Sequence, residues 1–325
     1  MTNLPPPCKW STNQIDLYKI HRVSCDALEF FGKPATEFRQ PVWRHPEYAA
    51  FLQHQTPETF DSQTAGEDQV RELLMMLKSI HFHDYSIPVS TRRDYSDQDT
   101  LTDQVIKLVL QFIGMGQNKS TMIRTNTRVL LQQNGFFFSV TMDAAVVGEH
   151  SILHLLLITE KENKPYDPNR TSFGQLMACA IGAFQHNNEI RKSLEIPTLD
   201  FMIFPAMIWS GSVPSFYRIK ITHELSEAVR CPGNLKRPDN DTYVAQLHLP
   251  IPNEWMGYGL WRMRNRAIVM KILENMKDFI PCGLLDIPVS WNRFMMDLEP
   301  EHSSDGKPSN IITNDDVLEV DAEFD

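Results

Sequence analysis

The feature that most constrains the fold is a short apolar run, Ile152 to Ile158, which ends in the acidic segment Thr159-Glu160-Lys161-Glu162. Within it, residues 154–158 are apolar at both odd and even positions, whereas a half-exposed strand would alternate between apolar and polar residues. The run is too short to span a membrane. It therefore predicts a central β-strand covered on both faces.

Turn signals place further strands on either side of this run. Asn134-Gly135 is a strong hairpin signal between predicted strands at 128–131 and 136–141. A second hairpin through residues 148–151 would make 144–147 the antiparallel partner of the central strand. Downstream, two apolar segments, 201–209 and 216–220, flank a Ser-Gly-Ser turn and predict another strand pair.

Acidic side chains gather at the end of the central strand. Because side chains alternate along a strand, Ile158, Glu160 and Glu162 share one face. The preceding hairpin would bring Asp143 to the same end. Three oxygen donors suit Mg²⁺ or Mn²⁺, which prefer carboxylate and water ligands. The alternative is that these are solvated surface acids.

Two helices are predicted before the first strand and one after the central strand. Residues 66–77 carry apolar side chains at core spacing, and so do residues 101–112. A later helix opens near Phe173-Gly174-Gln175. From the helix at 101–112 onward, the predicted order of elements is thus helix, three strands, helix and strand.

This order resembles the PD-(D/E)xK nuclease superfamily over residues 60 to 225. The resemblance rests on Asp143, the Glu160-x-Glu162 pair, the Gln175 helix and the strand at 201–208, and it is closest to fungal and Crinkler-associated members. It implies an α/β fold with a restriction-endonuclease-like core, in which a central mixed sheet is flanked by helices in α-β-β-β-α-β order. N- and C-terminal extensions would flank this core.

The resemblance also implies roles for individual residues. Asp143, Glu160, Glu162 and Gln175 would be catalytic, and Asp143, Glu160 and Glu162 would bind Mg²⁺ or Mn²⁺. The family often adds an acid from its first core helix. Glu67 and Glu72 both qualify, and we take Glu67 as the fourth expected ligand.

The chain departs from the family pattern at two positions. Met142 replaces the proline before the aspartate, which only shapes a turn. Glu162 stands where the family has a lysine that offsets charge in the transition state. Lys161 points to the opposite face by alternation, and Lys164 lies beyond the strand.

Two functions follow from this pattern. The first is a metal-dependent nuclease that hydrolyses phosphodiester bonds of DNA or RNA. The alternative is a catalytically inactive nuclease-fold protein that acts as an interaction or effector module, for which the replaced lysine argues. Metal dependence of activity separates the two.

Composition divides the chain into four parts: an N-terminal extension packed on the core (1–60), the core (61–225), a C-terminal helical extension (226–295) and an acidic tail expected to be disordered (296–325). The tail holds ten acids against Lys307 alone, so it carries a net charge of -9 out of the chain's -10. It is either a solubilising tail or a nucleic-acid mimic lying over a basic groove.

The most basic element is a long helix expected at 260–273. Its arginines Arg262, Arg264 and Arg266 are candidates for nucleic-acid contacts through phosphate, and a solvated polar face is the alternative. The five cysteines, an odd number without metal-binding spacing, indicate reduced thiols. With no signal peptide or transmembrane run seen, the expected location is intracellular, either cytoplasmic or nuclear, without membrane association.

Overall fold

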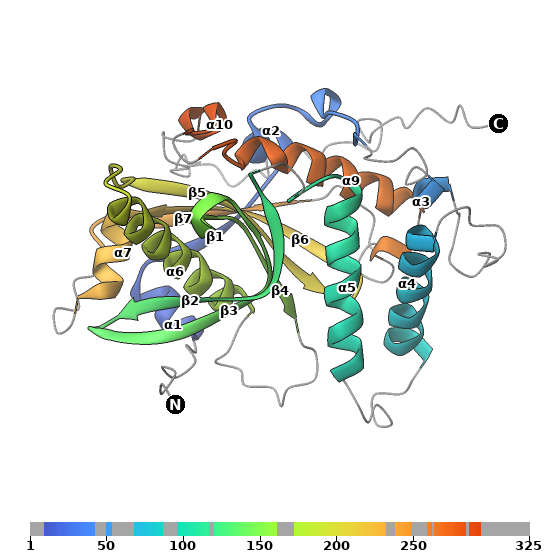
Figure 1. Cartoon of the computed structure of the whole chain (residues 1–325), viewed down its shortest axis with the longest axis horizontal. Coiled ribbons are helices and arrows are strands. Elements are labelled where there is room, and N and C mark those ends of the chain that lie inside the picture. The colour runs from blue at the N-terminus through green and yellow to red at the C-terminus, as the bar shows by residue number, and fades with distance from the viewer. Residues whose placement is uncertain are drawn as a thin grey trace, which may run out of the picture.

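A seven-stranded mixed sheet forms the centre of the molecule and helices flank it, as the computed structural model shows (Figure 1). The structure describes residues 10–42, 50–53, 68–86, 96–116, 120–160, 172–231, 238–248, 259–261, 263–283 and 286–293. The strands follow the order β1-β7-β6-β5-β4-β3-β2. The predicted α/β class with a mixed sheet flanked by helices is confirmed.

The strands are β1 (Ile20–Cys25), β2 (Met122–Gln133), β3 (Phe136–Val147), β4 (Leu153–Glu160), β5 (Phe201–Ser210), β6 (Val213–Thr222) and β7 (Thr242–Leu247). The α-helices are α1 (Thr12–Leu17), α2 (Ala27–Phe31), α3 (Ala50–Gln53), α4 (Asp68–Ser86), α5 (Ser96–Phe112), α6 (Ser172–Ser193), α7 (His223–Arg230), α9 (Met263–Met276) and α10 (Val289–Arg293). Short 3-10 helices occur at η1 (Ala35–Glu37), η4 (Glu149–Ser151), η5 (Gly259–Trp261) and η6 (Lys277–Phe279).

Strand β4 is the central strand that its sequence predicts. It lies between β3, to which it is antiparallel, and β5, to which it is parallel. Every side chain from Leu153 to Thr159 is buried. Both faces of β4 are therefore covered, which explains why its sequence is apolar at odd and even positions alike.

Strands β2 and β3 form one long hairpin around Asn134-Gly135. Both turn residues have left-handed φ angles, 51° and 77°, as a two-residue hairpin of this kind requires. The strands are longer than predicted, because residues 136–141 and 144–147 belong to a single strand that pairs with β2 along its length. No glycine or proline interrupts β3, so nothing in its sequence ends the strand early.

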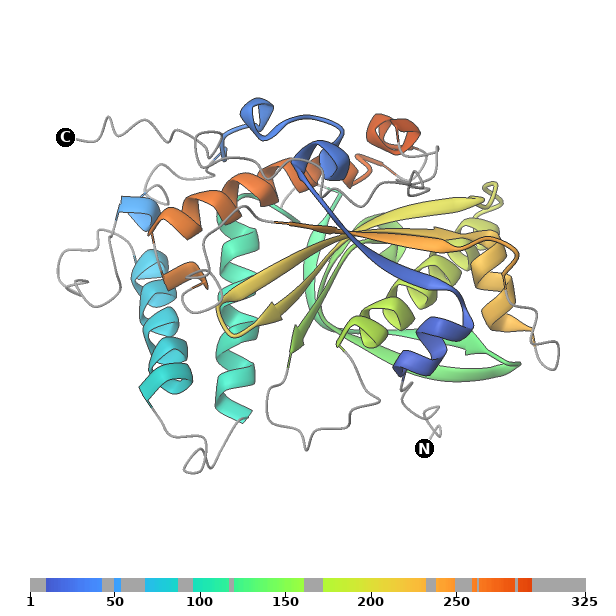
Figure 2. The same ribbon diagram turned by 180° about the vertical axis from the view of Figure 1, so that it is seen from behind.

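Helices α5 and α6 lie on opposite sides of the β2–β4 part of the sheet (Figures 1 and 2). Helix α6 packs closely on one side: a Cβ at Gly182 would stand 3.1 Å from side-chain carbons of both Val129 and Val140. Helix α5 contacts β2, β3 and β4 from the other side. Helix α4 packs against α5.

The terminal parts of the chain also supply strands. Strand β1 from the N-terminal extension pairs in parallel with β7 from the C-terminal extension, and β7 pairs with β6. The sequence analysis missed β1, β7 and α7, because six-residue strands and an eight-residue helix carry little periodic signal. The long helix predicted at 260–273 is present as α9. No helix in the described ranges is long and apolar enough to cross a membrane.

Candidate functional site at the end of strand β4

The Asp143 carboxylate is held at the point where β3 stops pairing with β4. The last pair between these strands is Ala144 with Leu157. Beyond it, Oδ2 of Asp143 accepts a hydrogen bond of 2.7 Å from the backbone N–H of Thr159. The side chain is only 7% exposed. The side chain of Asp143 therefore accepts a hydrogen bond from the β4 backbone beyond the last strand pair. This hydrogen bond fixes the position of its carboxylate.

Asp143 lies on the face of the sheet opposite α6. Val140 contacts Gly182 of α6, and side chains alternate along β3, so Asp143 points to the other side. The pairing of Ala145 with Leu156 carries the same alternation into β4, so Ile158 shares the face of Asp143. The structure thus brings Asp143 to the end of the strand that carries Glu160, as the sequence predicted. The side chain of Glu160 and all of Glu162 and Glu67 lie outside the described residues.

Gln175 and Cys179 are one helical turn apart on α6, and both contact the same backbone group. Nε2 of Gln175 donates to the carbonyl oxygen of Thr141 at 3.2 Å, and Sγ of Cys179 lies 3.6 Å from that oxygen. Thr141 precedes Asp143 by two residues. Gln175 therefore reaches β3 from the face opposite Asp143, where it positions the main chain beside the acid.

The helix next to the acidic site is α5. Helix α4, which begins after Glu67 and carries Glu72, packs against α5, and Glu72 is exposed. On α5, Asp103 is half-buried. The sequence does not single out Asp103, because it predicts the first core helix at residues 66–77. Only the fold shows that α5 contacts β4, and this contact is what points to Asp103.

The described residues include only part of the predicted metal-binding set. The described residues contain no group of three or more His, Cys, Asp or Glu side chains close enough to hold an ion. Of the predicted ligands, only the Asp143 side chain belongs to them. The donors that the sequence assigns to this strand end are all carboxylates, which fits a hard cation such as Mg²⁺.

Arg266 of α9 is fully buried, although the sequence analysis had placed it among the phosphate-contacting candidates. Its guanidinium lies 5.0 Å from the centre of the Phe51 ring, and burial lowers its pKa to about 10. The structure therefore gives Arg266 a packing contact in place of a surface position. Arg262 and the side chain of Arg264 lie outside the described residues.

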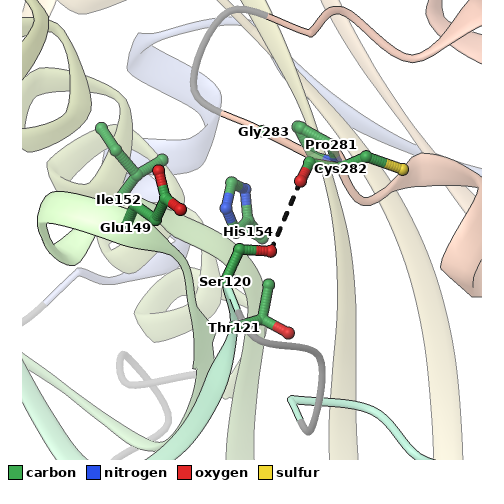
Figure 3. Close-up of a pocket in the computed structure, with 8 residues that line it drawn as sticks. All are labelled: Ser120, Thr121, Glu149, Ile152, His154, Pro281, Cys282 and Gly283. Atoms are coloured by element: carbon green, nitrogen blue, oxygen red, sulfur yellow. Dashed lines mark hydrogen bonds between the residues drawn. The ribbon is translucent and has the colours of Figure 1, made fainter.

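A pocket at the opposite end of β4 surrounds His154. Its lining residues are Ser120, Thr121, Glu149, Ile152, His154, Pro281, Cys282 and Gly283 (Figure 3).

His154 is 6% exposed, and burial lowers its pKa to about 4. Its Nδ1 has no hydrogen-bond partner in the described part of the chain. The thiol of Cys282 points away from it (Figure 3). A cavity of about 10 Å³ admits no more than a water molecule, so this pocket is too small for a substrate.

Comparison with known proteins adds no relative. No protein-family model matches this chain, and no curated protein matches it.

Proposed function

We propose that the chain is a metal-dependent phosphodiester hydrolase of the PD-(D/E)xK type, with Asp143 and Glu160 as Mg²⁺ ligands. The observation that carries the proposal is the hydrogen bond between the Asp143 carboxylate and the N–H of Thr159, the residue before Glu160. This hydrogen bond brings Asp143 to the strand end that carries Glu160, an acid 17 positions later in the sequence. A nuclease of this type needs its acids at such a point.

The arrangement of elements supports the restriction-endonuclease-like core. Helix α5 is followed by the adjacent strands β2, β3 and β4, then by α6 and by β5. This is the α-β-β-β-α-β order that the resemblance implies. Strand β5 lies next to β4 and parallel to it, so α6 is a crossover connection.

The residues at the site would divide the work as follows. Asp143 and Glu160 would hold the cation, with Glu162 and Glu67 as further ligands. A bound Mg²⁺ or Mn²⁺ supplies activation of water and stabilisation of charge on the phosphate. The N–H of Thr159 fixes the Asp143 carboxylate, and Gln175 fixes the main chain beside it from the other face.

One observation favours the second candidate, an inactive interaction module. Asp143 is 7% exposed and accepts a main-chain hydrogen bond, which is also what a purely structural carboxylate does. The replacement of the family lysine by Glu162 points the same way. The two candidates therefore differ in what Asp143 is needed for, namely cleavage or folding.

Substitutions of Asp143 that separate these roles test the proposal. Asp143→Asn keeps an oxygen that can accept from Thr159 but weakens cation binding, whereas Asp143→Ala removes both functions. Labelled single- and double-stranded DNA and RNA are incubated with Mg²⁺ or Mn²⁺. Glu160→Ala is included, and Glu149→Ala, an exposed acid at the far end of β4, is the matched control.

The nuclease predicts cleavage by the wild type and by Glu149→Ala, and none by Asp143→Asn, which stays folded. Cleavage that survives in Asp143→Asn contradicts the assigned ligand. A folded wild type that cleaves no substrate with either cation favours the interaction module.

A further inference from the structure

One face of the β2–β3 hairpin is open. Helix α6 covers the side that carries Val129 and Val140. On the opposite side, Arg128 is exposed, and Leu130 and Phe137 are 52% and 54% exposed. In both views the hairpin extends away from α5 (Figures 1 and 2).

The open face leads to Asp143. Arg128 pairs with Thr141, Leu130 with Ser139 and Gln132 with Phe137. Because paired residues share a face and alternate along each strand, Arg128, Leu130, Phe137 and Asp143 all belong to this side. Thr141 and Asp143 are two residues apart, so Arg128 is a diagonal neighbour of Asp143 across the strand pair, about 7–8 Å away.

The two arginines on this face have no carboxylate partner in the part of the chain that the structure describes. Arg128 makes no hydrogen bond or ion pair with any part of the chain that the structure describes. Arg124 lies four residues before Arg128 on the same strand. It donates hydrogen bonds to Ser151 and Met122 and has no carboxylate partner among the described residues. An exposed guanidinium without an acid attracts phosphate groups.

The apolar side chains on the face have a matching role. Phe137 presents its aromatic ring to solvent on this face, whereas Phe136, 69% exposed at the turn, belongs to the opposite side by alternation. An exposed ring on the same strand face as exposed arginines is the combination that binds single-stranded nucleic acid, in which a base stacks on the ring and the cations contact the backbone. Duplex DNA offers no unstacked bases, so the exposed ring would find no partner there.

We propose that the open face of β3 and β2, formed by Arg128, Leu130 and Phe137, binds single-stranded nucleic acid and directs the strand toward Asp143. The direction toward Asp143 rests on the proposed nuclease function, whereas the binding does not. The surface therefore assigns the substrate class of the site as single-stranded.

Binding without metal tests this surface independently of cleavage. Fluorescence anisotropy of labelled oligothymidylate and oligouridylate is measured with the full chain in EDTA, over a range of salt concentrations, and compared with a duplex. The variants are Arg128→Glu and Phe137→Ala. Helix α4 supplies matched controls in Lys78→Glu and Met75→Ala, a lysine and a 55% exposed methionine remote from the hairpin.

We expect Arg128→Glu to weaken binding roughly tenfold and to reduce the salt slope by about 0.7. Phe137→Ala should weaken binding on the order of tenfold with an unchanged salt slope. The α4 variants should bind as the wild type does. All four side chains are exposed, so thermal unfolding should be unchanged and a lost affinity cannot be blamed on misfolding.

Each contrary result has a defined meaning. Wild-type affinity in both hairpin variants overturns the proposed surface, as does tighter binding of the duplex or no binding of any strand by the folded wild type. Cleavage that proceeds normally in Arg128→Glu and Phe137→Ala also overturns the surface and leaves the nuclease standing. Binding through this face without cleavage in Mg²⁺ or Mn²⁺ supports the surface and overturns the nuclease.

Discussion

Asn187 of α6 binds the main chain of Leu153 in β4 with both the oxygen and the nitrogen of its side-chain amide. Oδ1 accepts from the N–H of Leu153 and Nδ2 donates to its carbonyl oxygen, each at 2.8 Å. Near this point the register between β3 and β4 shifts, at Val146 and Val147. At the other end of β4, Asp143 accepts from Thr159. The central strand is therefore completed at both ends by side chains, where regular pairing with β3 is interrupted or stops.

Removing the Asn187 amide should destabilise the fold. Asn187 is fully buried, so Asn187→Ala leaves the N–H and C=O of Leu153 without partners in the interior. We expect the free energy of unfolding to fall by about 2–4 kcal/mol. Urea denaturation followed by circular dichroism measures it. Ser193→Ala at the exposed end of α6 is the control, and an equal loss in both variants contradicts the assigned role.

A single methyl group at Gly148 should have a steric effect. A Cβ there would stand 2.2 Å from Nε2 of His154, while the backbone φ of -90° is open to alanine. Gly148→Ala should therefore cost about 1–3 kcal/mol of stability through overpacking. Adding His154→Ala should recover part of the loss, so that the double variant is more stable than the sum of the single effects predicts. If the stability losses of the two single variants simply add in the double variant, the contact between residue 148 and His154 is not the cause of the loss.

Stability should depend on pH through His154. Burial lowers its pKa from 6.5 to about 4, so between these values the unfolded chain binds a proton that the folded chain does not. The stabilising effect is complete above pH 6.5 and is lost as the pH falls toward 4. From pH 7.5 to pH 5, the wild type should lose about 2 kcal/mol more than His154→Leu does. Denaturant titrations at both pH values measure this difference, and parallel curves contradict it.

The thiols should differ in reactivity. Burial raises the pKa of Cys25 to about 12, so at neutral pH its thiol is neutral as well as inaccessible. Cys231 and Cys282 are exposed. Brief treatment of the folded protein with iodoacetamide, followed by peptide mass spectrometry, should label Cys231 and Cys282 and leave Cys25 unmodified. Labelling of Cys25 at the rate of the other two would contradict its buried position in β1.

The sequence predicts the local parts of this fold well. Residues 155–158 are apolar at every position because β4 is covered on both faces, and Asn134-Gly135 is one of the few residue pairs that a two-residue turn of this kind accepts readily. The pairing of β1 with β7 was not predictable in this way. It joins residues about 220 positions apart in two short strands, and neither strand carries a strong periodic pattern.

Side-chain environment was harder to predict than the elements themselves. The sequence places Arg266 on a basic helix, yet α3 and the N-terminal segment cover that side of α9. Asn275 then binds the main chain of Arg39, and Glu274 accepts from the N–H of Val42. A helical pattern shows which side is most apolar, but it does not show that a second segment covers the polar side.

The role of Gln175 provides the last test, because the resemblance makes it catalytic and its contacts make it a positioning residue. It binds the carbonyl of Thr141 from the face opposite Asp143. Gln175→Ala should therefore reduce stability by about 1 kcal/mol and lower kcat, while the Mg²⁺ concentration that gives half-maximal cleavage stays the same. Glu160→Ala, which removes a proposed ligand, should raise that concentration or abolish cleavage. If Gln175→Ala also shifts the Mg²⁺ midpoint without loss of stability, Gln175 acts at the cation and not through the main chain of β3.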